Sequence, residues 1–117
     1  MLVATTSLLF LMNYVRNRPL ILDKEISKVA MVRCLEMKEF SHVEYLNRFY
    51  FEGVMNKYVY TGENLGLDFA TDLDFFRAMQ NSKLHNDNIL NKNFTRVGIA
   101  MCDRKHVILF AGKKKRL

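Results

Sequence analysis

Three histidines and several acidic side chains are the residues of this chain best suited to chemistry. The histidines are His42, His85 and His106. Neutral imidazoles combined with carboxylates bind divalent metals such as zinc, or transfer protons near neutral pH. No two histidines are four residues apart, so the zinc-binding helical pair is absent, as are the serine-hydrolase elbow, the P-loop and the dinucleotide fingerprint. Spacing alone therefore predicts no enzyme class.

No convincing nucleophile accompanies these groups. Ser41 and Ser82 lie close to histidines in the sequence, but near neighbours rarely face one another, so we assign neither a role. Cys34 falls on the apolar side of a predicted helix and is expected to be packed rather than reactive. Cys34 and Cys102 could form one bridge if the fold brings them together. His106 begins the last predicted strand and is expected to be exposed.

Four helices are expected to position these residues. The first should end near residue 17, because Pro19 disfavours helical geometry at Arg18. Asp23 is a suitable N-cap for the second helix, and Thr71 with Asp74 resembles a capping box at the start of the fourth. The third is an aromatic-rich amphipathic stretch. The four helices are expected over about residues 8–17, 24–37, 43–56 and 72–81.

The C-terminal third is predicted to form a β-hairpin. Residues 97–101 and 107–110 are rich in β-forming side chains, and the turn-prone Asp103–Arg104 lies between them. Residues 61–67 contain two glycines and are expected to form a loop or short strand, and residues 83–93 are a polar stretch. Helices followed by a terminal hairpin predict a single α+β domain over residues 1–112 and a basic tail over 113–117.

Five further residues are expected to have mainly structural roles. Gly62, Gly66 and Gly98 are interpreted as positions that the backbone geometry requires. Asn64 and Asn88 are expected to tie loops together through their side-chain amides.

Composition narrows the class of protein. The chain has 117 residues, of which 50% are apolar and 26% charged, as in one globular domain. No apolar run reaches the roughly 18 residues of a membrane-spanning helix. The net charge is +6, but four of the 18 basic residues lie in the tail, which leaves +2 for the body. We therefore expect a solvated tail and no specific nucleic-acid binding, with a polyanion contact through Lys113, Lys114, Lys115 and Arg116 as the alternative.

Four blocks of sequence, in this order, resemble the CAP superfamily (cysteine-rich secretory proteins, antigen 5 and pathogenesis-related 1 proteins), in particular its bacterial SCP-like extracellular branch. The blocks are Phe40–Ser41–His42, Gly62–Glu63–Asn64–Leu65, the segment from Ser82 to Leu90, and Val97–Gly98–Ile99–Ala100. The resemblance implies a CAP-like α-β-α sandwich with about four helices and a small antiparallel sheet that includes the C-terminal hairpin.

The resemblance also implies a cleft lined by His42, Glu63 and His85, in which His42 and His85 are candidate zinc ligands. The second glutamate of the family has no match in this chain. Asp72 and Asp74 stand in the corresponding segment, but their side chains are shorter and differently placed.

An incomplete set of site residues favours a protein that is not an enzyme. The resemblance predicts a monomeric extracellular or bacterial cell-surface domain that binds an unknown ligand, such as a host protein, a glycan or a lipid. The alternatives are a metal-assisted hydrolase or peptidase, and a lipid or sterol binding module. Ten Asn, ten Lys and no Trp suggest an AT-rich bacterial genome. Together with the resemblance, this composition predicts a domain of a bacterial surface lipoprotein of spirochaete type, whose lipidated leader is missing from this chain.

Overall fold

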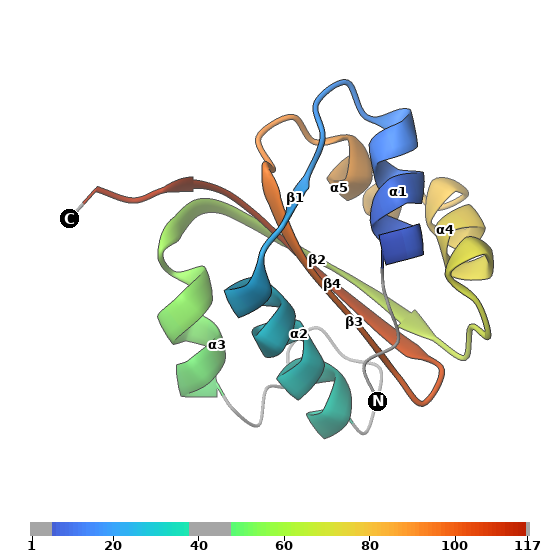
Figure 1. Cartoon of the computed structure of the whole chain (residues 1–117), viewed down its shortest axis with the longest axis horizontal. Helices are drawn as coiled ribbons and strands as arrows, with labels where there is room; N and C mark the ends of the chain where they lie inside the picture. Colours follow the sequence, from blue (N-terminus) through green and yellow to red (C-terminus); the bar gives the residue numbers. More distant parts are fainter. Residues whose placement is uncertain (1–5, 38–47, 117) are drawn as a thin grey trace.

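A four-stranded sheet of order β1-β3-β4-β2 organises the computed structural model, which describes residues 6–37 and 48–116 (Figure 1). Strands β3 and β4 are its two central strands, and β2 and β1 form its edges. In chain order the elements are α1 (Thr6–Val15), β1 (Ile21–Leu22), α2 (Lys24–Glu36), α3 (Arg48–Met55), β2 (Tyr58–Leu67), α4 (Asp72–Gln80), α5 (Lys83–Leu90), β3 (Arg96–Cys102) and β4 (Lys105–Lys114).

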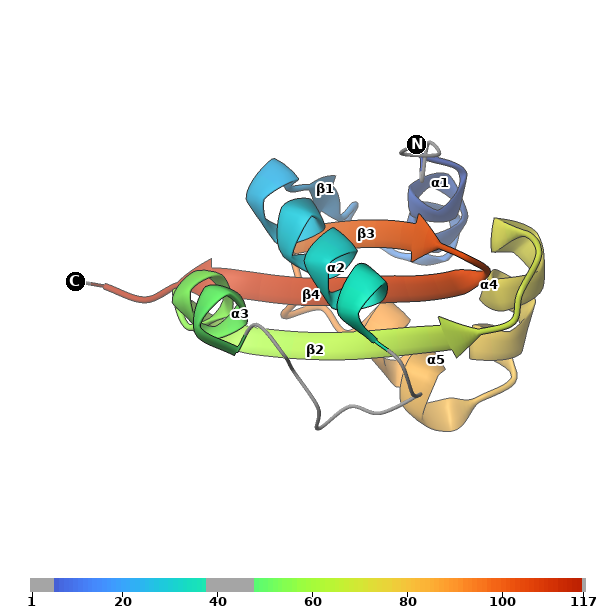
Figure 2. The same cartoon turned by 90° about the horizontal axis from the view of Figure 1, so that it is seen from below.

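The helices lie in two layers, one on each face of the sheet. Figure 2 shows α2 and α3 on one face and α1, α4 and α5 toward the other. Each layer of helices packs on a separate apolar cluster of the sheet. Leu65, Val107 and Leu109 belong to the cluster under α2, whereas Ile108 and Phe110 belong to the cluster under α1, α4 and α5. Successive residues of a strand point to opposite faces, so the central strand β4 supplies both clusters. The predicted α+β sandwich is confirmed.

Local capping explains where two predicted helices begin. The Asp23 carboxylate accepts a hydrogen bond from the Ile26 amide at 2.9 Å, and the Thr71 hydroxyl accepts one from the Asp74 amide at 3.1 Å. The first helix ends at Val15, two residues earlier than predicted. Of the predicted third helix, residues 43–47 lie outside the described part of the chain.

Strand β2 corrects the expectation of a loop or short strand at residues 61–67. It is a ten-residue strand paired antiparallel to β4. A Cβ atom on Gly66 would lie 2.5 Å from the Phe75 ring, and one on Gly62 would lie 2.8 Å from Phe94. These glycines therefore allow aromatic rings to lie directly against the strand, and neither marks a turn.

The C-terminal hairpin is confirmed, with Asp103 and Arg104 in its turn. Both have positive φ, 46° and 60°, as a two-residue type I′ turn requires. The sheet is mixed, since the short edge strand β1 pairs parallel to β3. Five helices are described instead of about four, because residues 83–90 of the polar stretch form α5.

The side chains of the basic tail are exposed, as expected for a solvated tail, but its backbone is partly ordered in the sheet. Lys113 and Lys114 belong to β4, where Lys114 pairs with Tyr58 of β2. The Lys115 amide donates a hydrogen bond to the Lys57 carbonyl at 2.7 Å. In residues 6–37 and 48–116, no helix has the length and apolar character needed to cross a membrane.

Candidate functional site

Strand β2 and helix α5 are joined by a set of amide hydrogen bonds that fixes two of the three predicted cleft residues. We call Glu63, Asn64, His85 and Asn88 the β2–α5 junction. The Asn64 side chain donates to the His85 carbonyl at 3.0 Å, and the Asn88 side chain donates to the Asn64 side chain at 2.8 Å and to the Glu63 carbonyl at 3.4 Å. The asparagines therefore do tie segments together, although they connect a strand to a helix rather than two loops.

The Glu63 carboxylate points away from α5. Its neighbour Asn64 faces α5, so Glu63 faces the layer formed by α2. There one carboxylate oxygen lies 3.3 Å from Nε of Arg33, and the two side chains are only 10% and 4% exposed. The junction thus brings the backbone of Glu63 to α5, while the charge of Glu63 is held against a buried guanidinium.

His85 has an unexpected partner in Ser82. The Ser82 hydroxyl lies 2.7 Å from Nδ1 of His85, so the expectation that this serine does not face the histidine is wrong. Residues three apart lie on one side of a helix, and Ser82 is the N-cap of α5. It makes no capping hydrogen bond to the helix backbone, so its hydroxyl orients the imidazole instead.

The remaining predicted cleft residue, His42, lies outside the described residues. Among those described, no three His, Cys, Asp or Glu side chains are grouped as metal ligands would be. The Glu63 carboxylate is already neutralised by Arg33, and a guanidinium beside it would repel a divalent cation. Taken by themselves, Glu63 and His85 do not fit a zinc site.

His106 is buried, so the expectation that it is exposed is wrong. Its side chain is on the face of β4 that packs against α4, with its ring centroid 4.7 Å from that of Phe75. Nε2 lies 3.1 Å from a carboxylate oxygen of Asp72, whose other oxygen accepts a hydrogen bond from Ser7. Burial lowers the pKa of His106, and Asp72 only partly opposes this shift. Asp72 therefore interacts with His106, while Asp74 is exposed.

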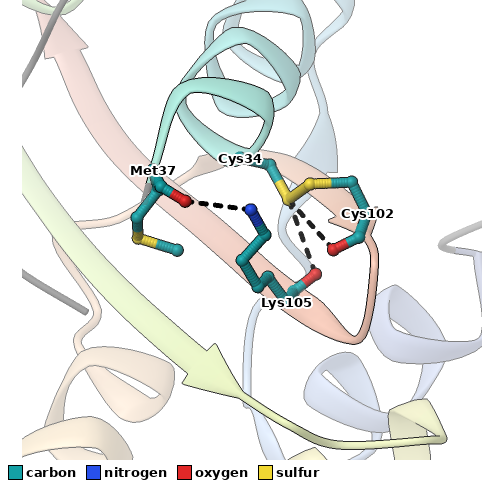
Figure 3. The surroundings of a disulfide bond; sticks show 4 residues. All are labelled: Cys34, Met37, Cys102 and Lys105. Carbon is teal, nitrogen blue, oxygen red and sulfur yellow. Dashed lines mark hydrogen bonds between the residues drawn. A yellow bond between two sulfur atoms is a disulfide. The ribbon is translucent and has the colours of Figure 1, made fainter. Parts of the chain in front are cut away.

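Cys34 and Cys102 form a disulfide that joins α2 to the end of β3 (Figure 3). The Cα atoms are 6.1 Å apart, and Cys34 is fully buried, as its helical position predicted. The Cys34 sulfur lies 3.5 Å from the Lys105 carbonyl, and the Lys105 ammonium donates to the Met37 carbonyl at 2.9 Å. The disulfide and this hydrogen bond hold the C-terminal end of α2 against the hairpin.

Sequence reasoning missed Arg33 and Ser82. A signal for Arg33 was present, because it follows Ile26, Val29 and Ala30 at helical spacing and therefore lies on the buried side of α2. A charged residue in such a row needs a buried partner of opposite charge. For Ser82, the identity of an N-cap residue does not reveal which hydrogen bond it makes.

No family model matches the chain, but individual proteins do. The chain is 31% identical over 88 residues to the uncharacterized protein YkwD of Bacillus subtilis, a match that covers 70% of this chain and 34% of YkwD. The chain therefore spans about a third of the length of this curated relative.

Three solved structures are similar to this chain in fold. An extracellular protein containing an SCP domain from Bacillus anthracis has a TM-score of 0.82 and 26% identity, covering 92% of this chain and 40% of its own. A cysteine-rich secretory protein from Staphylococcus aureus has a TM-score of 0.78 and 22% identity, and the match covers 92% of this chain and 38% of that protein. An outer surface protein from Borrelia burgdorferi has a TM-score of 0.72 and 16% identity, and the match covers 97% of this chain and 98% of that protein.

Proposed function

We propose that this chain, which has the fold of an SCP domain of the CAP superfamily, acts outside the cell as a non-enzymatic binding domain. The location is supported by the Cys34–Cys102 disulfide, since disulfides persist mainly in oxidising compartments. It is also supported by the similar proteins, which are described as an extracellular, a secretory and an outer surface protein.

The observation that carries the binding proposal is the β2–α5 junction. Its amide network fixes the backbone carbonyls of Glu63 and His85, so that α5 is held in a defined position against β2. The Ser82 hydroxyl contacts the His85 ring and makes no capping hydrogen bond to α5. A capping hydrogen bond typically stabilises a protein by about 1 kcal/mol, so the contact with His85 replaces a stabilising interaction. An imidazole whose ring and supporting helix are both fixed before a ligand arrives suits a binding site. The family resemblance adds His42 to this site.

The proposal is tested by NMR with a panel of small probes, namely neutral monosaccharides and dipeptides at millimolar concentration. We expect at least one probe to shift the amide signals of the junction, and we expect His85→Gln to abolish that shift. The imidazole signal of the buried His106 is an internal control and should not move. Probes that leave the junction unperturbed, or that bind His85→Gln as well as the wild type, would contradict the proposal.

Zinc binding is a separate alternative that calorimetry decides. The resemblance assigns zinc to His42 and His85, whereas Arg33 beside Glu63 disfavours a divalent cation. We therefore expect no heat of zinc binding at millimolar metal. Heat that disappears in both His42→Ala and His85→Ala would establish a metal site and overturn this expectation.

Hydrolysis is the second candidate function, and the contact between Ser82 and His85 favours it. A hydroxyl within 2.7 Å of an imidazole nitrogen is the arrangement from which a serine nucleophile is activated. A peptide-library digest with and without zinc tests both a serine and a metal-assisted mechanism. Cleavage that Ser82→Ala removes would refute the non-enzymatic proposal, and we expect no cleavage.

A lipid or sterol module is the least supported alternative. It requires an apolar groove long enough for an acyl chain. Among the described residues, one hollow between the loop after α1 and the end of α5 and another beside the start of β2 are lined largely by basic and amide side chains, and neither is such a groove.

A further inference from the structure

One end of the sheet gathers cationic side chains from four separate segments of the chain. We call this surface the basic end, and it comprises Arg18, Lys57, Lys92 and Lys113–Arg116. We propose that the basic end binds a linear sulfated polysaccharide. The proposal is independent of the β2–α5 junction, since the two sets share no residue.

The tail is presented by the folded body. Lys114 pairs with Tyr58 in the sheet, and the Lys115 amide is bonded to the Lys57 carbonyl at 2.7 Å. Lys113 has a φ of 55°, a left-handed conformation that non-glycine residues adopt only rarely. Holding these cations in place before a ligand arrives lowers the entropic cost of binding.

The first hollow of the basic end lies between the loop after α1 and the end of α5. It has a volume of about 650 Å³. Arg16 is used structurally here, since its guanidinium donates to the carbonyls of Ile89 and Phe94, each at 2.6 Å. The exposed cations that remain for a ligand are Arg18 and Lys92.

The second hollow lies between the start of β2 and the end of β4 and has a volume of about 430 Å³. Its walls are basic apart from one amide: Asn56, Lys57, Lys114, Lys115 and Arg116. Lys57 is paired with Glu25 at 2.9 Å, so this pair adds no net charge and the cations left for a ligand come from the tail. Lys114, Lys115 and Arg116 are exposed.

The two hollows are neighbours. Asn93 lines the first hollow, and its carbonyl oxygen would lie only 1.8 Å from a Cβ atom on Gly112. Gly112 directly precedes Lys113, from which the cations of the tail continue to the second hollow. A flexible chain could therefore contact both sets of cations.

The shape and chemistry of the hollows favour a polysaccharide over a bilayer. Sulfate groups supply the charge that lysine and arginine bind. The side-chain amides of Asn17 and Asn93 in the first hollow and of Asn56 in the second can donate to and accept from sugar hydroxyls. Because the cations line recesses, a narrow polymer can enter where the flat surface of a bilayer reaches only the rims.

The test measures binding to heparin, a linear sulfated polysaccharide, as a function of salt. Three double variants remove two charges each: Arg18→Gln/Lys92→Gln, Lys115→Gln/Arg116→Gln, and the control Arg77→Gln/Lys83→Gln at exposed positions of α4 and α5. The dependence of log affinity on log salt should flatten by about 2 in each of the first two, roughly 1 for each contacting cation. Thermal unfolding of each variant verifies folding.

The outcomes separate a specific site from general charge. We expect both test variants to elute from heparin at lower salt than the wild type, and the control to elute close to it. Equal losses in all three variants would show that only net charge matters and would overturn the proposal. Binding to phosphatidylglycerol vesicles without binding to heparin would identify a membrane surface and would also overturn it.

Discussion

The Cys34–Cys102 disulfide should supply a large part of the stability of this domain. It closes a loop between residues 68 apart in the sequence, and the described part of that loop contains two of the four strands and three complete helices. Cross-linking such a loop removes conformational freedom from the unfolded chain, in which the two cysteines would otherwise be far apart.

The size of the effect follows from the length of the loop. The loop-entropy relation gives roughly 4 kcal/mol for a separation of this length. Unfolding entropy is about 2.1 cal/mol/K per residue, so a chain of this length should lose roughly 15 °C of its melting temperature on reduction.

Urea unfolding of the oxidised and the reduced wild type measures this contribution. The reduced protein keeps both sulfur atoms, so the comparison isolates the cross-link from packing. Because Cys34 is fully buried, reduction should be carried out in the unfolded state before refolding. The variant Cys34→Ala/Cys102→Ala is the control, and reductant should leave its stability unchanged.

Two results would refute the reasoning. If mass spectrometry finds two free thiols in the protein prepared under oxidising conditions, the disulfide between Cys34 and Cys102 does not form and the prediction has no basis. A stability loss of less than about 1 kcal/mol with an intact bond would show that the loop-entropy relation does not apply to this unfolded chain.

Three further predictions concern buried contacts. Gly98→Ala should destabilise the domain by more than about 2 kcal/mol in urea unfolding, because its Cβ would lie 2.3 Å from the backbone of Ile26. Arg33→Met should cost about 3–5 kcal/mol, because it leaves the Glu63 carboxylate buried without its guanidinium, and a loss under about 1 kcal/mol would contradict this. The wild type should lose stability as pH falls from 7.5 to 5.5, because the unfolded His106 (pKa about 6.5) takes up a proton that the folded one, with its lowered pKa, resists. His106→Phe should remove this part of the pH dependence, at most about 1.4 kcal/mol, and an unchanged pH profile would count against it.

A matched control exists for the glycine prediction. Gly53 lies in α3 and has open space around the position of its missing Cβ. Gly53→Ala should therefore stabilise the domain by up to about 1 kcal/mol, since alanine favours a helix over glycine. Opposite effects at the two glycines would separate steric contact from helix propensity.

Features that depend on neighbouring residues were predictable. Asp23 and Thr71 begin their helices because each accepts a hydrogen bond from an amide three residues ahead, and this preference is visible in the sequence. Asp103–Arg104 forms the hairpin turn because Asp tolerates positive φ and the flanking runs favour strands. The sandwich, in contrast, was predicted from the resemblance of the four sequence blocks to the CAP superfamily and not from local preference.

Features that depend on distant residues were not predictable. The glycines of β2 resembled loop residues because the rings of Phe75 and Phe94 that press on them come from elsewhere in the chain. His106 was assigned to the surface because nothing near it in sequence shows that Asp72 and Phe75 would cover it.

By itself the sequence determined the α+β class, the starts of α2 and α4, and the hairpin, and its resemblance to a family supplied the candidates Glu63 and His85. The tertiary structure alone decided that Arg33 faces Glu63, that the two cysteines form a bond, and that the tail joins other cations at one end of the sheet. The physical reason is range: hydrogen bonding and dihedral preference act between neighbours, whereas ion pairs, disulfides and surface charge depend on which distant segments the packed core brings together.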